Sequence, residues 1–105
     1  TVRAAGDAIV TRELDLIRVK GREEAVRMYE ILGTGDERQR WEPLIREFEL
    51  GLTHYRSRRW DDASACFERA LEVKPGDGPA LLYLERCARF ATDPPPPTWT
   101  GVTVM

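Results

Sequence analysis

The chain begins with two short runs in which apolar and polar residues alternate, and a helical pattern follows them. The first run is Glu13–Lys20 and the second is Ala25–Leu32. The segment between them, Gly21–Glu24, has the length of a hairpin loop. Apolar residues occupy both faces of each expected strand, so the hairpin needs cover on both sides. The pattern therefore predicts an N-terminal antiparallel hairpin that is covered by helices or by another chain.

After the hairpin, the spacing of the apolar residues changes to that of helices. Thr34 and Glu37 have the spacing of a capping box, which marks a helix start. From Trp41 to Tyr55 apolar residues recur at intervals of three and four, which predicts one apolar helix face. Two more helices are expected, over 61–73 and 79–90. The pattern thus predicts three helices joined by short turns.

The last part of the chain is rich in proline. Asp93–Pro97 cannot continue a helix and favours an extended polyproline II conformation. The residues after it, 98–105, either dock back as a short strand or stay loose. The expected fold class is mainly α with a small β-hairpin. Its parts are a hairpin at 1–33, a helical domain at 36–91 and an extended Pro-rich tail at 92–105.

Composition narrows the classes of partner. The 105 residues carry a net charge of −2, with 42% apolar and 32% charged residues. This balance gives no support for nucleic acid or an anionic membrane as a partner. No apolar run approaches the roughly 18 residues of a membrane-spanning helix, and no signal peptide opens the chain. We expect a cytoplasmic protein without direct membrane insertion. Because the first residue is Thr1, we also expect the chain to be processed or cut from a longer one.

Cysteine and histidine offer little chemistry. Cys66 and Cys87 lie among apolar residues, which favours buried thiols in a reducing compartment, with a disulfide between them as the alternative. His54 is the one histidine, so the side chains of a zinc site or a catalytic triad are not assembled. We expect His54 to fill an ordinary helix position and assign no metal ligand.

The stretch from Leu44 to Asp77 resembles a tetratricopeptide repeat, a unit of two antiparallel helices. The positions that carry the resemblance are Leu50, Gly51, Ala63, Phe67, Ala70 and Pro75. Gly51 and Ala63 are small where the two helices would cross closely, and Phe67 would fill the space between them. Glu47 and His54 stand where the family usually has Trp and Tyr. The run Asp77–Phe90 resembles the first helix of a second repeat whose partner helix is missing.

Such repeats bind a protein or peptide on their helical face, and the alternative is a helical cap or spacer without a ligand. About three repeats are usually needed for independent stability, and this chain has one and a half. We therefore expect the open faces to be buried on the hairpin, on a missing domain or on a second copy of the chain in a homodimer.

Residues 1–33 resemble the C-terminal end of the catalytic domain of a class III adenylate/guanylate cyclase. The resemblance rests on four segments in the family's order, which are residues 4–8, 12–15, 19–22 and 26–33. In that family these segments form the end of the last helix and the final two antiparallel strands. Bacterial members often continue into a tetratricopeptide-like tail similar to Phe48–Gly78, and the tail commonly ends in a Trp-containing stretch like Trp99–Val102.

This resemblance implies a reaction for a parent enzyme. A class III cyclase converts ATP to cyclic AMP, or GTP to cyclic GMP, and releases pyrophosphate. Two aspartates of the family hold Mg²⁺ or Mn²⁺, and two catalytic domains form the site together. The segments with these aspartates would lie before Thr1. We therefore assign no catalytic residue, metal or cofactor to this chain.

One position carries over from the family. Lys20 matches a lysine that reaches the terminal phosphates of the nucleotide, a contact that would be made in the intact enzyme only. The plainer interpretation of Lys20 is a solvated lysine beside a hairpin turn.

The favoured hypothesis is a catalytically inert C-terminal segment of a signalling cyclase. The segment would mediate contact with its own catalytic domain, a second copy or another protein, and any membrane anchor of the parent would lie upstream. The alternative is a stand-alone tetratricopeptide adaptor with no enzymatic parent. The sequence does not distinguish ATP from GTP, because the base-selecting residues would also lie before Thr1.

Overall fold

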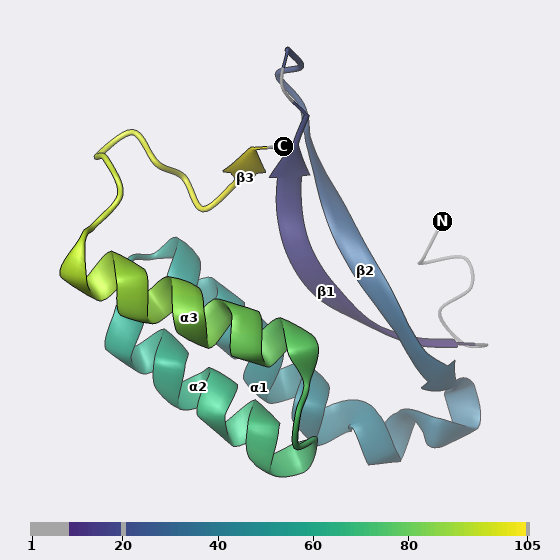
Figure 1. Cartoon of the computed structure of the whole chain (residues 1–105). Coiled ribbons are helices and arrows are strands. Elements are labelled where there is room, and N and C mark those ends of the chain that lie inside the picture. Colours follow the sequence, from purple (N-terminus) through teal and green to yellow (C-terminus); the bar gives the residue numbers. More distant parts are fainter. Residues whose placement is uncertain (1–8, 20, 105) are drawn as a thin grey trace.

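A hairpin is followed by three helices and a short third strand in the computed structural model, which describes residues 9–19 and 21–104 (Figure 1). The elements are β1 (Ile9–Arg18), β2 (Ala25–Thr34), the 3₁₀ turn η1 (Gly35–Glu37), α1 (Arg38–Arg56), α2 (Trp60–Val73), α3 (Gly78–Thr92) and β3 (Thr103–Val104). The expected fold class, mainly α with an N-terminal hairpin, is confirmed. Lys20 and residues 4–8, which the cyclase resemblance assigns to a helix end, lie outside the described residues.

The sheet has the strand order β2-β1-β3, with β1 antiparallel to β2 and parallel to β3. The pairing of β1 with β2 shifts register twice, and Leu14 is the residue of β1 left without a partner at the second shift. β1 also begins earlier than the predicted Glu13, because Val10 is fully buried and pairs with Gly33.

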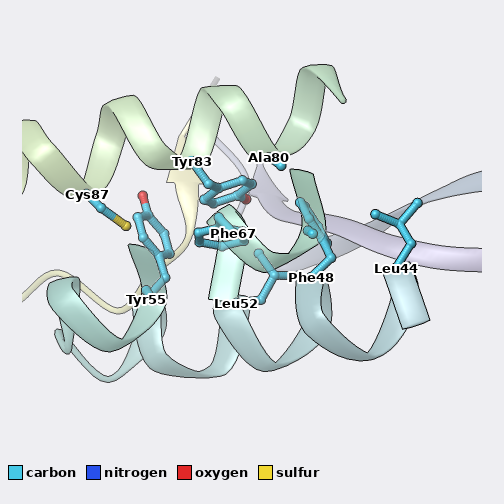
Figure 2. Close-up of a cluster of buried hydrophobic side chains, with 10 residues drawn as sticks. Leu44, Phe48, Leu52, Tyr55, Phe67, Ala80, Tyr83 and Cys87 are labelled. Atoms are coloured by element: carbon cyan, nitrogen blue, oxygen red, sulfur yellow. The ribbon is translucent and has the colours of Figure 1, made fainter. Parts of the chain in front are cut away.

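The three helices enclose one hydrophobic core (Figure 2). The rings of Phe48 and Phe67 lie 5.3 Å apart, and the ring of Tyr83 lies 5.7 and 5.2 Å from them. The buried cluster comprises Leu44, Phe48, Leu52, Tyr55, Ala63, Phe67, Ala70, Ala80, Tyr83 and Cys87. Because all three helices contribute to it, none of them is stable without the others.

Helices α1 and α2 approach closely at a glycine. A Cβ atom on Gly51 would lie 2.7 Å from Cε1 of Phe67, so a larger residue does not fit. Ala63 and Ala70 are fully buried, as the repeat spacing predicts. The local sequence therefore sets the helix separation by placing a glycine opposite an aromatic ring.

After α3, the chain crosses back to the sheet. Residues 93–102 form neither helix nor strand, and β3 then pairs with the end of β1. Of the two alternatives from the sequence, docking as a short strand and a loose tail, the structure has the first. Trp99 packs against the core on the way, with its ring 5.2 Å from that of Tyr55.

Candidate protein-interaction site

The hairpin is fastened to the helices by a buried ion pair. The guanidinium of Arg12 on β1 donates two hydrogen bonds to the carboxylate of Asp77, at 2.9 and 2.7 Å. Its Nε donates to Glu30 of β2 at 2.8 Å, and the group lies 4.6 Å from the ring centre of Phe48. Both Arg12 and Asp77 are buried, at 0% and 1% exposure. One cation thus joins β1, β2, α1 and the start of α3.

Asp77 has a second role, at the start of α3. Its side chain accepts a hydrogen bond from the backbone N–H of Ala80 at 3.2 Å and so caps the helix. Burial alone would raise the pKa of the Asp77 carboxyl, but the hydrogen bonds and charge of Arg12 outweigh it and lower that pKa below its usual value of 3.8. The carboxylate is therefore ionised at neutral pH.

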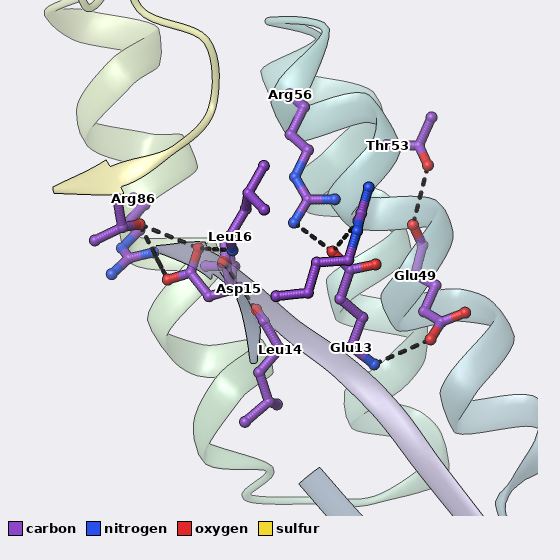
Figure 3. A network of polar contacts seen from close by, with 11 residues as sticks. Glu13, Leu14, Asp15, Leu16, Glu49, Thr53, Arg56 and Arg86 are labelled. Atoms are coloured by element: carbon purple, nitrogen blue, oxygen red, sulfur yellow. Dashed lines mark hydrogen bonds and ion pairs between the residues drawn. The ribbon is translucent and has the colours of Figure 1, made fainter. Parts of the chain in front are cut away.

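A second set of polar contacts holds β1 to α1 and α3 (Figure 3). The backbone N–H of Glu13 donates to Glu49 at 3.0 Å, and the carboxylate of Glu13 pairs with Arg56 at 2.8 Å. On the other side, Arg86 of α3 lies 3.4 Å from the carboxylate of Asp15. The helices therefore hold β1 through its backbone as well as through its side chains.

Strand β2, in contrast, is largely uncovered. Among the described residues, it is the edge strand opposite β3, so its outer backbone groups have no strand beside them. Its exposed apolar side chains are Val26 at 60%, Met28 at 45%, Tyr29 at 43% and Ile31 at 66%. The helices thus cover β1, while no element within residues 9–19 and 21–104 covers these four side chains of β2. A long apolar edge of this kind is a surface for another protein segment.

An apolar groove continues this surface toward the helices. It has a volume of about 250 Å³ and lies between the hairpin and the start of α3. Met28 and Ile17 line it from the hairpin, and Pro79 and Leu82 line it from the helix. Leu81 and Leu82 are themselves 50% and 44% exposed. The edge of β2 and this groove together form the candidate interaction site.

The residues predicted from the repeat spacing fall into two groups. Gly51, Ala63, Phe67 and Ala70 are buried between α1 and α2 and hold the helices together. Leu50 is 43% exposed on α1, and Pro75 is exposed in the turn before α3. None of these six residues lies in the candidate interaction site.

The remaining sequence expectations concern single side chains. Cys66 and Cys87 are buried free thiols, and burial raises the pKa of both. Within 9–19 and 21–104, no three potential ligands among His, Cys, Asp and Glu gather closely enough for a metal ion. None of the helices in these ranges is long and apolar enough to cross a membrane.

Sequence reasoning missed Arg12, Asp77 and the anchoring role of Trp99. Asp77 did carry a signal, because Asp77-Gly78-Pro79 is a helix start with a capping residue and an early proline. Arg12 carried no such signal, since a charged residue in a strand is usually exposed.

Comparison with known proteins finds a tetratricopeptide repeat at residues 48–77. The chain is also 32% identical over 92 residues to the terminal-differentiation-specific adenylate cyclase of Dictyostelium discoideum. That match covers 83% of this chain and 4% of the cyclase, so the chain spans a small fraction of its relative. No solved structure matches the chain significantly. The chain therefore contains a tetratricopeptide repeat and has a distant likeness to part of an adenylate cyclase.

Proposed function

We propose that the chain is the C-terminal interaction segment of a class III nucleotide cyclase. In this proposal β1 and β2 are the last strands of the catalytic sheet, and the helices are a docking unit attached to them. The parent would form a cyclic nucleotide and pyrophosphate with Mg²⁺ or Mn²⁺. This segment would be inert and would contact its own catalytic domain and a second copy of the chain.

The observation that carries the proposal is the uncovered edge of β2. A hairpin held rigidly by Arg12 and Asp77, yet exposing four apolar side chains on its other strand, is suited to a contact with further protein. The likeness to the Dictyostelium cyclase adds support. The match covers 83% of this chain, which is more than residues 34–105 make up. The matched region therefore includes part of the hairpin.

A second candidate function is a stand-alone adaptor, and the tetratricopeptide repeat at 48–77 is the observation that favours it. Such repeats serve protein contacts without any enzymatic domain. An adaptor would use the groove between the hairpin and α3 for a partner protein, and no nucleotide chemistry would be attached to it.

The coding sequence around Thr1 separates the two functions. The cyclase proposal expects an upstream domain with two metal-binding aspartates, whereas a start codon directly before Thr1 would overturn it in favour of the adaptor. The purified chain should form no cyclic nucleotide from ATP or GTP with Mg²⁺ or Mn²⁺. Turnover above a protein-free blank would contradict the assignment of an inert segment.

The proposed contact surface is tested by charge insertion. Val26→Lys with Ile31→Lys should weaken self-association, or binding to the upstream domain, by at least ten-fold in sedimentation experiments. Leu50→Lys is the matched control, because Leu50 is also an exposed apolar residue but lies on α1, away from the candidate interaction site. Equal effects of the two changes would contradict the placement of the surface on β2.

A further inference from the structure

The segment 93–104, here called the C-terminal strap, lies across the ends of the helices and the edge of the sheet (Figure 1). Its anchor is Trp99. The indole ring lies 5.2 Å from the ring of Tyr55, 5.6 Å from Trp60 and 5.5 Å from Phe90. These three partners belong to α1, α2 and α3, so one side chain of the strap bridges the whole helical unit.

The backbone of the strap is held as well. The guanidinium of Arg58 donates hydrogen bonds to the carbonyl oxygens of Pro95, at 3.1 Å, and of Pro96. The same group lies 5.5 Å from the ring centre of Trp99. Arg58 has φ of 65°, the left-handed region that non-glycine residues rarely adopt. This conformation closes α1, since the backbone N–H groups of Arg58 and Arg59 donate to the carbonyl oxygens of Tyr55 and His54 at 3.1 and 2.9 Å. It also fixes the position from which the Arg58 side chain reaches the strap.

The strap ends by adding a strand to the sheet. β3 pairs with Ile17 and Arg18 of β1, and the hydroxyl of Thr103 donates to the carboxylate of Asp15 at 3.0–3.1 Å. Before it, Gly101 has φ of 88°, and a Cβ there would lie 2.6 Å from Cγ of Arg56. The strap therefore fits closely at this point, and glycine is required.

An aromatic anchor, captured carbonyls and strand addition are the means by which domains bind extended peptides. We propose that the surface formed by Tyr55, Trp60, Phe90, Arg58 and the outer edge of β1 is a binding site for an extended peptide that carries a tryptophan. In this structure the chain's own strap occupies the site. An open surface hollow of about 340 Å³ lies beside the strap, lined by Trp99 and by Arg86 and Arg89 of α3. This proposal does not depend on the proposed cyclase function.

The test asks whether the strap can be supplied by a separate molecule. In the full chain, Trp99→Ala removes the anchor and leaves the aromatic surface vacant. A labelled peptide with the sequence of residues 93–104 should then bind the variant at least ten-fold more tightly than it binds the wild-type chain, measured by fluorescence anisotropy. The matched control peptide has alanine in place of tryptophan. It should bind the variant at least ten-fold more weakly than the peptide that keeps the tryptophan. The proposal would be overturned if the wild-type chain and the variant bound the peptide with equal affinity. It would also be overturned if the variant bound both peptides with equal affinity.

A second variant guards against misfolding of the first. Arg58→Gln keeps the strained backbone position but removes the charge that holds the strap. Its far-UV circular dichroism should match that of the wild type, while hydrogen exchange at Ile17 and Arg18 should rise at least five-fold. Unchanged exchange at both residues would show that the strap is not held through Arg58 and would contradict the proposed recognition of its backbone.

Discussion

Arg12 and Asp77 are 65 residues apart in the sequence, and their side chains form two hydrogen bonds while both are fully buried. This pair connects the hairpin with the turn between α2 and α3. A buried ion pair that loses one partner leaves an uncompensated charge, which is costly in a region that water does not reach. The hairpin and the helical unit therefore depend on each other for folding.

The first prediction concerns this dependence. Arg12→Met removes both hydrogen bonds from Arg12 to the buried Asp77 carboxylate and leaves it only the half-exposed Lys74 as a charged partner, at 3.5 Å. The free energy of unfolding should fall by about 3–5 kcal/mol in urea titrations. Arg27→Met is the control, because Arg27 also pairs with a carboxylate, Glu13 at 2.7 Å, but its side chain is 54% exposed. The control should cost about 1 kcal/mol or less. Similar costs for the two variants would contradict the structural role of Arg12.

The second prediction concerns acid stability. Because the pKa of Asp77 is lower in the folded chain than its usual value of 3.8, the ionised form stabilises the fold. That contribution is fully present above pH 3.8 and should be lost as the pH falls from there through the lowered pKa. Asp77→Asn should be less stable than the wild type at neutral pH, and the difference should shrink below pH 3.8. A difference that stays constant down to pH 2 would be inconsistent with this assignment.

The third prediction tests the close approach of α1 and α2. Gly51→Ala should destabilise the chain by about 1–3 kcal/mol, although alanine favours helices, because its Cβ would meet the Phe67 ring at 2.7 Å. Gly78→Ala is the matched control, since no atom lies within 4 Å of a Cβ at that position. Thermal unfolding should show a lower midpoint for Gly51→Ala only, and a neutral result there would refute the tight contact.

The fourth prediction concerns the centre of the helical core. Phe67 is fully buried, so Phe67→Asp introduces an unpaired charge between α1 and α2 and should unfold the helices. Circular dichroism at 222 nm measures the loss. Leu81→Asp adds the same charge at a position that is 50% exposed and should leave the signal unchanged. A folded Phe67→Asp variant would show that the core does not require this ring.

The fifth prediction concerns the two thiols. Burial raises the pKa of Cys66 and of Cys87, and neither thiol is exposed to reagent. Alkylation by iodoacetamide at pH 8 should therefore be at least a hundred-fold slower in the native chain than in 6 M guanidinium chloride. Mass spectrometry counts the modified cysteines. Rapid labelling of either one in the native chain would mean that the helices open locally.

Much of the fold follows from local sequence patterns. The hairpin and the three helices appear as changes in the spacing of apolar residues, and the Gly51–Phe67 contact follows from the repeat spacing. The early start of β1 was not predicted, because Val10 lies before the alternating run and is buried through its pairing with Gly33. The extent of a strand depends on its partner strand, which a short window of neighbouring residues does not include.

The contacts that anchor the hairpin to the helices could not be predicted from the spacing of apolar residues. Arg12 and Asp77 are brought together by the tertiary structure. In its own segment Arg12 looks like an ordinary surface charge, and Asp77 indicates a helix cap but not an ionic partner. The contacts of Trp99 likewise combine three helices that are separate in sequence. The exposed edge of β2 also depends on tertiary structure, because only the packed helices reveal which strand they leave uncovered.

The edge of β2 has a practical consequence for anyone who handles the protein. This ten-residue strand contains neither proline nor lysine, two residues that hinder pairing between the edge strands of different molecules. At high concentration, molecules of the isolated chain should therefore associate through this edge. Under the proposed function, a protein that contacts this edge would also prevent such association.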